Sequence, residues 1–61
     1  MKIEHLISDK EFMDEFVALA NHSYQNYGAY EDVYYTYESK LSDDMILALL
    51  DYCEENNLIE Y

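Results

Sequence analysis

Three stretches of the chain alternate apolar and polar residues with the period of an α-helix. The first covers about residues 9–26, where acidic residues lie opposite a stripe of apolar residues. That stripe consists of Phe12, Met13, Phe16, Val17, Ala20 and Tyr24. Ser8 and Glu11 have the spacing of a capping box, in which each side chain bonds the backbone N–H of the other, so we expect Ser8 to be the N-cap. Gly28 predicts the end of this helix, because glycine adopts the left-handed conformation without strain.

The second stretch, about residues 29–40, has a helical stripe and also a run with high β-propensity. The stripe consists of Tyr30, Val33, Tyr34, Tyr37 and Leu41. Residues 33–37 read Val-Tyr-Tyr-Thr-Tyr, a composition enriched in strands. The helical spacing favours a helix. A short strand that pairs with residues 3–7 or 58–61 is the alternative.

The third stretch covers about residues 43–55. Ser42 is a suitable N-cap, and Asp43 and Asp44 would place negative charge in the first turn, where the helix dipole favours it. Met45, Ile46, Leu49, Leu50 and Cys53 form one face. The two asparagines at 56 and 57 indicate the end of the helix.

Three short amphipathic helices bury their apolar faces by packing together. The pattern therefore predicts an all-α fold, a small three-helix bundle formed by residues 1–61 as a single domain. The α+β alternative adds a short strand pair from the two termini. The predicted core consists of Phe12, Phe16, Val17, Ala20, Val33, Tyr34, Tyr37, Ile46, Leu49, Leu50 and Cys53.

The charge of the chain changes the picture of what this bundle does. Asp and Glu number 14, Lys and Arg together number 3, and the formal net charge is -11. The hydrophobic fraction is 51%, which is far too high for a disordered acidic tail. A folded domain with this much like charge loses stability through self-repulsion, so we expect a positively charged partner to compensate. Direct binding of nucleic acid is excluded, because affinity for phosphates comes from Lys and Arg.

The eight tyrosines are the second unusual feature, because a core this small cannot bury all of them. We expect Tyr27, Tyr30 and Tyr35 to reach the surface beside acidic residues. Exposed tyrosine supplies a large contact area at low entropic cost and is common among interface hot spots. An aromatic ring next to a carboxylate also suits Arg or Lys, which stack on the ring and pair with the acid.

Catalytic and metal-binding chemistry have little support in the sequence. His5 and His22 belong to no recognisable constellation, and the expectation for His22 is an exposed position on the first helix. Cys53 lies on an apolar face among acidic neighbours, as a buried cysteine does and a nucleophile does not. The spacings of calcium and zinc sites are absent from the sequence. We therefore expect no enzyme activity, no metal and no cofactor.

The lone cysteine and the N-terminal sequence bear on the compartment. Only one cysteine is present, so no disulfide forms within the chain, and the first residues contain no apolar run of signal-peptide length. No stretch approaches the roughly 20 apolar residues that a membrane span needs. These features predict a cytoplasmic protein that does not bind membranes.

In length, charge, lack of Arg and the interleaving of Tyr with acid, as at Tyr30-Glu31-Asp32 and Tyr37-Glu38, the chain resembles the small acidic inhibitors of phages and other mobile elements. These are DNA mimics that act against restriction enzymes, CRISPR nucleases and DNA-repair enzymes. The resemblance implies a non-catalytic inhibitor, acting in the cytoplasm of a bacterial host cell, that occupies the basic surface of a nuclease, polymerase or repair enzyme. The candidate contact set consists of Asp14, Glu15, Tyr27, Tyr30, Glu31, Asp32, Tyr35, Glu38, Asp43, Asp44, Asp51, Glu54 and Glu55.

A second function class remains open from the sequence. The chain would then be a small helical adaptor, a regulatory subunit or a homodimer that binds through an apolar face, and its acidity would serve solubility. Salt separates the two hypotheses, because binding to a basic surface weakens steeply with ionic strength and apolar docking does not.

Overall fold

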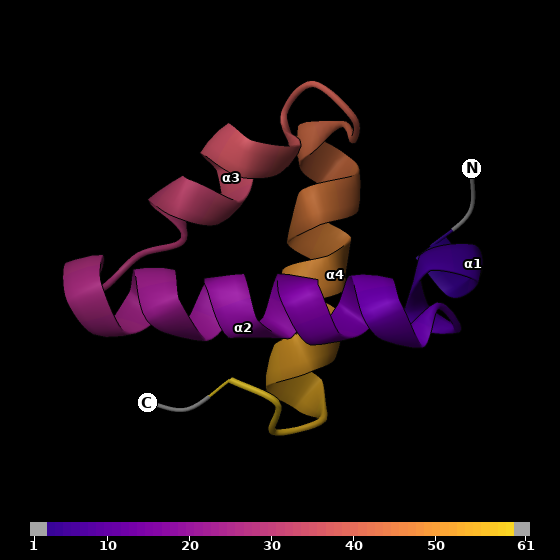
Figure 1. The fold of residues 1–61 in the computed structure, drawn as a ribbon, viewed down its shortest axis with the longest axis horizontal. Coiled ribbons are helices and arrows are strands. Elements are labelled where there is room, and N and C mark those ends of the chain that lie inside the picture. The colour runs from indigo at the N-terminus through magenta and orange to yellow at the C-terminus, as the bar shows by residue number, and fades with distance from the viewer. Residues whose placement is uncertain (1–2, 60–61) are drawn as a thin grey trace.

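A computed structural model describes residues 3–59, and within that range every regular element is a helix. The helices are α1 (Ile3–Ile7), α2 (Lys10–Tyr27), α3 (Glu31–Tyr37) and α4 (Asp43–Glu55). The predicted all-α class and small helical bundle are confirmed, although α1 was not predicted. In Figure 1, α2 runs across the molecule, α4 crosses behind it, α3 lies above its C-terminal half and α1 lies beside its N-terminal end.

The start of α2 corrects one prediction. Its N-cap is Asp9 instead of Ser8, and the Asp9 carboxylate accepts a hydrogen bond from the backbone N–H of Phe12 at 3.2 Å. The Ser8 hydroxyl instead donates to the carbonyl of His5 at the end of α1, at 3.1 Å. Because Ser8 terminates the preceding helix, its side chain is not available to begin the next one.

Gly28 ends α2 as predicted. Its φ of 69° lies in the left-handed region, and its N–H donates to the carbonyl of Tyr24 at 2.8 Å. A Cβ built on Gly28 would meet no atom within 4 Å, so the conformation itself, and not lack of space, favours glycine here.

The segment that was ambiguous between helix and strand is the helix α3, which is shorter than the predicted 29–40. Val33 and Tyr37 are buried while Tyr35 between them is 79% exposed, whereas in an extended strand all three would lie on the same face. The strand alternative is wrong for residues 3–7 and 31–37, which are helical, and for Leu58 and Ile59, which are not in a strand. Residues 60–61 of that alternative lie outside the described range.

Both predicted bounds of α4 are confirmed. The Ser42 hydroxyl accepts from the N–H of Met45 at 3.3 Å. At the other end Asn57 takes a left-handed φ of 58°, and the N–H of Leu58 bonds the carbonyl of Cys53 at 2.8 Å. Together with the bond from the Asn57 N–H to the Glu54 carbonyl, at 3.2 Å, this is a Schellman motif.

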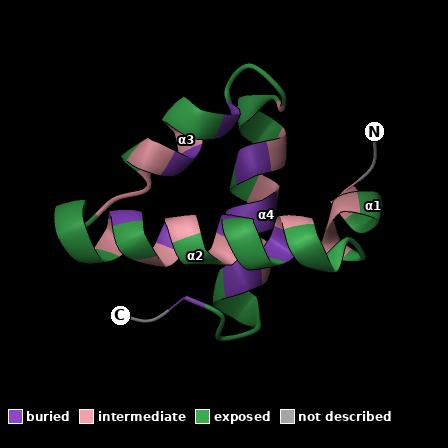
Figure 2. Cartoon of the chain, in the orientation of Figure 1, coloured by how far each residue is buried: buried purple, intermediate pink, exposed green. Residues whose placement is uncertain are grey.

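The core lies between these helices and largely matches its prediction. Eight of the predicted residues are buried: Phe16, Ala20, Val33, Tyr37, Ile46, Leu49, Leu50 and Cys53. The other three, Phe12, Val17 and Tyr34, are half-buried and pack against this core. Met13 and Ile59 are also buried, so Ile59, which follows α4, covers part of the core. Figure 2 shows buried residues on α2, α3 and α4 and none on α1.

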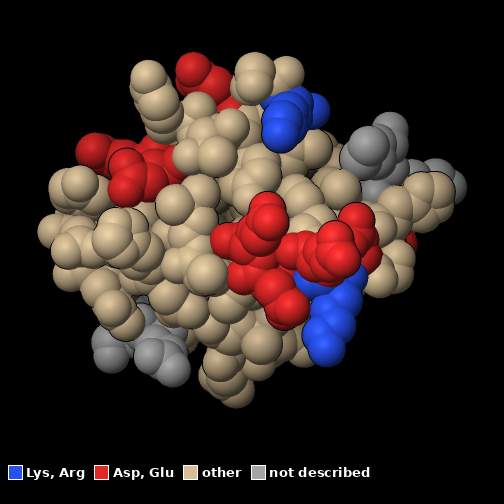
Figure 3. Space-filling view, in the orientation of Figure 1, with Lys and Arg blue, Asp and Glu red and all other residues tan. Residues whose placement is uncertain are grey.

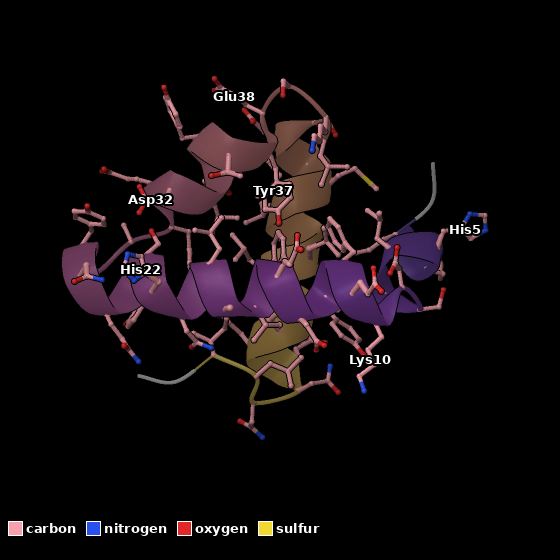
Figure 4. All side chains as sticks on the ribbon, in the orientation of Figure 1. His5, Lys10, His22, Asp32, Tyr37 and Glu38 are labelled. Atoms are coloured by element: carbon pink, nitrogen blue, oxygen red, sulfur yellow. The ribbon has the colours of Figure 1, made fainter. Side chains whose placement is uncertain are left out.

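An aromatic cluster joins α2 to α3 inside this core. The ring of Tyr37 lies 5.6 Å from that of Phe12 and 5.4 Å from that of Phe16, measured between centroids. The two phenylalanine rings are themselves 5.7 Å apart. Figure 4 shows Tyr37 between α3 and α2. Such pairs add about 0.5–1.5 kcal/mol each beyond the area that they bury.

Candidate functional site

The acidic side chains lie at the surface of the bundle. Every Asp and Glu within residues 3–59 is exposed except Asp32, which is half-buried. On the face drawn in Figure 3, acidic groups gather over α2 and, separately, over α3, with uncharged surface between them. The candidate contact set therefore does not form one continuous patch on this face.

The α2 group contains two residues of the candidate set, Asp14 and Glu15, and both are exposed. Glu15 also acts on the core beneath it. Burial raises the pKa of the Tyr37 hydroxyl, and the negative charge of Glu15 raises it further. Both effects favour the neutral form of this tyrosine.

The α3 group is held in place by a residue that sequence analysis did not single out. The N-cap of α3 is Tyr30, whose side chain makes no capping bond. The fully buried Ser23 of α2 takes that role, because its hydroxyl accepts from the backbone N–H of Asp32 at 3.3 Å and donates to the carbonyl of Ala29 at 2.8 Å. In the sequence, the signal for this capping role was a serine next to the apolar stripe of α2.

The exposed face of α3 carries the residues expected there. Glu31 and Glu38 are exposed, and Tyr35 between them is 79% exposed, the highest value among the exposed large hydrophobic side chains. Figure 4 shows Glu38 at the end of the molecule where α3 leads into α4. Tyr35 therefore presents its ring within one helical turn of acidic residues on both sides.

Two tyrosines at the α2–α3 connection behave differently from each other. Tyr27 is 62% exposed, as expected. Tyr30 is only half-buried where we expected exposure, because its ring packs against that of Tyr24 with centroids 5.6 Å apart. The Tyr30 hydroxyl donates to the Glu54 carboxylate at 3.1 Å, which joins two candidate residues from separate elements.

The remaining candidate residues belong to α4. Asp43, Asp44, Asp51, Glu54 and Glu55 are all exposed, and Leu47 among them is 51% exposed. Leu47 was absent from the candidate set. Its position could have been found from the sequence, because it is spaced three or four residues from Asp43, Asp44 and Asp51.

Cys53 and His22 take the environments predicted for them. Cys53 is buried, and burial together with the charge of Glu54 raises the pKa of its thiol to about 11. His22 is exposed and contacts the Asn26 amide through its Nδ1 at 3.2 Å. His5 projects away from the bundle at the α1 end (Figure 4). Neither histidine is part of a metal-binding cluster, since residues 3–59 hold no group of three or more His, Cys, Asp or Glu side chains suited to a metal ion.

Two further observations concern the same part of the chain. No pocket is present on the surface formed by residues 3–59. Among the four helices, none combines the length and apolarity needed to cross a bilayer.

Comparison with protein-family models, with curated proteins and with solved structures gives no match for this chain.

Proposed function

We propose that this protein is an acidic inhibitor that binds the basic, nucleic-acid-binding surface of a DNA- or RNA-processing protein. It acts by occupying that surface and performs no reaction. The inhibitors of phages and mobile elements that mimic DNA, such as anti-restriction and anti-CRISPR proteins, are the class that it resembles.

The observation that carries this proposal is the combination of a net charge of -11 with an ordered bundle whose described carboxylates lie at the surface. A helix places residues four apart about 6 Å from each other along its axis. Carboxylates with this spacing, such as Asp51 and Glu55 on α4, form a negative row on a rigid support. Such rows complement Lys and Arg side chains arranged to bind phosphates.

The exposed tyrosines add contact area to this charge. Tyr27 and Tyr35 are mostly exposed, and Tyr35 has Glu31 and Glu38 within one turn. An arginine of the partner can stack on the ring and pair with a carboxylate at the same time. These tyrosines also suit the alternative function, an adaptor or homodimer that docks through apolar contacts, so the experiment must separate the two.

The test is capture of partners from a bacterial lysate at low and at high salt, with mass spectrometry of the bound proteins. A double variant, Glu31→Gln with Asp43→Asn, removes two candidate charges. Glu4→Gln with Glu11→Gln is the matched control, since it makes the same change in net charge outside the candidate set. The proposal predicts a nucleic-acid-processing protein that is lost at high salt and is captured less well by the first variant than by the control.

Two outcomes would contradict the proposal. If the captured protein stays bound at high salt, docking is apolar and the adaptor hypothesis gains support. If both variants capture the partner as well as the unmodified protein, the candidate carboxylates do not make the contact.

A further inference from the structure

The outward face of α4 combines charge and an apolar side chain in an unusual way. With 3.6 residues per turn, the five acids of α4 and Leu47 fall within an arc of about 120° around the helix. The four buried residues of α4, Ile46, Leu49, Leu50 and Cys53, lie outside this arc. No lysine or arginine occurs anywhere on the helix.

Leu47 lies in the middle of this arc. Asp43 and Asp44 precede it by four and three residues, and Asp51 follows it by four, so all three are its neighbours on the helix surface. The side chain of Leu47 is 51% exposed, whereas Leu49 and Leu50 on the other side of the helix are buried.

A leucine at this position does not offset the negative charge around it. Like charges three or four residues apart destabilise a helix, and a lysine at 47 would relieve the repulsion by pairing with its acidic neighbours. A leucine relieves none of it and leaves about half of an apolar side chain in water. Isolated exposed leucines are common on proteins, but this one occupies the position where a cation would be most favourable.

We propose that this face of α4 is the ridge that docks on the partner, with Leu47 inserted into a small apolar depression that is bordered by Lys and Arg. This inference rests on the proposed function and adds to it the helix and the anchor residue. Charge complementarity favours a basic partner over a second copy of this chain, because two copies would bring two uncompensated acidic faces together. A leucine anchor surrounded by charge matches the usual organisation of an interface, in which an apolar centre is enclosed by a polar rim.

One substitution should have opposite effects on the stability of the fold and on binding to the partner. Leu47→Lys relieves the repulsion on α4, so it should raise the urea midpoint of unfolding. The same change removes the anchor and places a cation against a basic surface, so it should weaken binding to the purified captured protein by about tenfold or more. Gln25→Lys, at an exposed position of α2, is the control with the same change in charge. Leu47→Gln, which keeps the charge, should weaken binding at low salt through loss of the anchor alone.

The site of contact is tested by photo-crosslinking in the same lysate, with p-benzoylphenylalanine placed at position 47 and, in a control protein, at position 25. The expected product joins position 47 to a peptide from a Lys- and Arg-rich nucleic-acid-binding surface. Crosslinks between two copies of this chain would overturn the inference in favour of a homodimer. A basic protein that is captured in a salt-sensitive way is consistent with the proposed function. If it crosslinks only from position 25, or if it binds Leu47→Lys at full strength, the α4 ridge is overturned and the proposed function stays intact. Capture of no basic protein overturns both.

Discussion

Ser23 on α2 caps α3, because its buried hydroxyl accepts a hydrogen bond from the backbone N–H of Asp32 at 3.3 Å. The same hydroxyl donates to the carbonyl of Ala29 at 2.8 Å. One side chain thus satisfies a polar group on each side of the turn between the two helices, and no buried side-chain N or O atom within residues 3–59 lacks a partner. The acidic face of α3 depends on this connection for its position.

Removal of that hydroxyl should destabilise the protein. Ser23→Ala leaves the Ala29 carbonyl and the Asp32 N–H without their partner, which costs about 1–3 kcal/mol of unfolding free energy. Urea denaturation followed by circular dichroism measures the loss. Ser39→Ala, at an exposed position after α3, is the control and should change the unfolding free energy by less than about 0.5 kcal/mol. Equal effects of the two substitutions would show that the Ser23 hydroxyl does not cap α3.

Gly28 offers a test of backbone strain without steric interference. Its φ is 69° and no atom lies within 4 Å of the position that a Cβ would take. Gly28→Ala should therefore cost about 1 kcal/mol through the left-handed conformation alone. Gly28→Asn should cost less, since asparagine tolerates this conformation better. If alanine is the better tolerated of the two, the end of α2 does not take the left-handed conformation in solution.

The charge of the bundle should make its stability depend on salt. Between about 0.01 M and 0.15 M ionic strength the Debye length falls from about 30 Å to about 8 Å, which screens the repulsion between exposed acids. We expect sodium chloride over this range to raise the unfolding free energy by an amount on the order of 1 kcal/mol. The gain should be smaller in Leu47→Lys, whose added cation already relieves part of the repulsion. A loss of stability with salt would show that attraction, not repulsion, dominates the folded state.

Alkaline pH should destabilise the protein through Cys53. Its pKa is raised from an ordinary value of 9.0 to about 11, because the thiol is buried and lies near Glu54. Below pH 9 the thiol keeps its proton in both states. Between about pH 9 and 11 only the unfolded state loses it, so the unfolding free energy falls by up to about 1.4 kcal/mol per pH unit. The raised pKa of Tyr37 acts in the same direction from pH 10 upward.

Cys53→Ala isolates the thiol in this pH dependence. Urea unfolding at pH 8, 9 and 10 should show a shallower loss of stability in the variant than in the unmodified protein, even though the variant starts from a lower value because of the cavity that it creates. Parallel pH profiles would mean that Cys53 is accessible to solvent in the folded state.

Local patterns predicted most of the fold. The bounds of α4 followed from a serine cap and a clear apolar stripe, which need no information from elsewhere in the chain. The start of α2 was misassigned by one residue because Ser8 and Asp9 are both good caps, and only the presence of α1 decides between them. A helix of five residues is not stable alone, and α1 forms where Ile3, Leu6 and Ile7 pack against the core.

Part of the surface was also predictable from local sequence patterns. Exposure of the acids follows from their place on the polar faces of the helices. The half-burial of Tyr30 depends on Tyr24 and on Glu54, which is 24 residues away, so no local pattern contains it. The exposed Leu47 was within reach of sequence reasoning, because its acidic neighbours are at helical spacing.

Competition between duplex DNA and this protein for the purified captured partner tests whether the acidic protein occupies a nucleic-acid-binding surface. Fluorescence anisotropy of a labelled duplex, with increasing amounts of the acidic protein, reports whether the two ligands share one surface. Nucleic-acid mimicry predicts complete displacement of the DNA, with a midpoint that rises for Glu31→Gln with Asp43→Asn and not for Glu4→Gln with Glu11→Gln. A ternary complex, in which the partner holds DNA and this protein together at saturating concentrations, would contradict it.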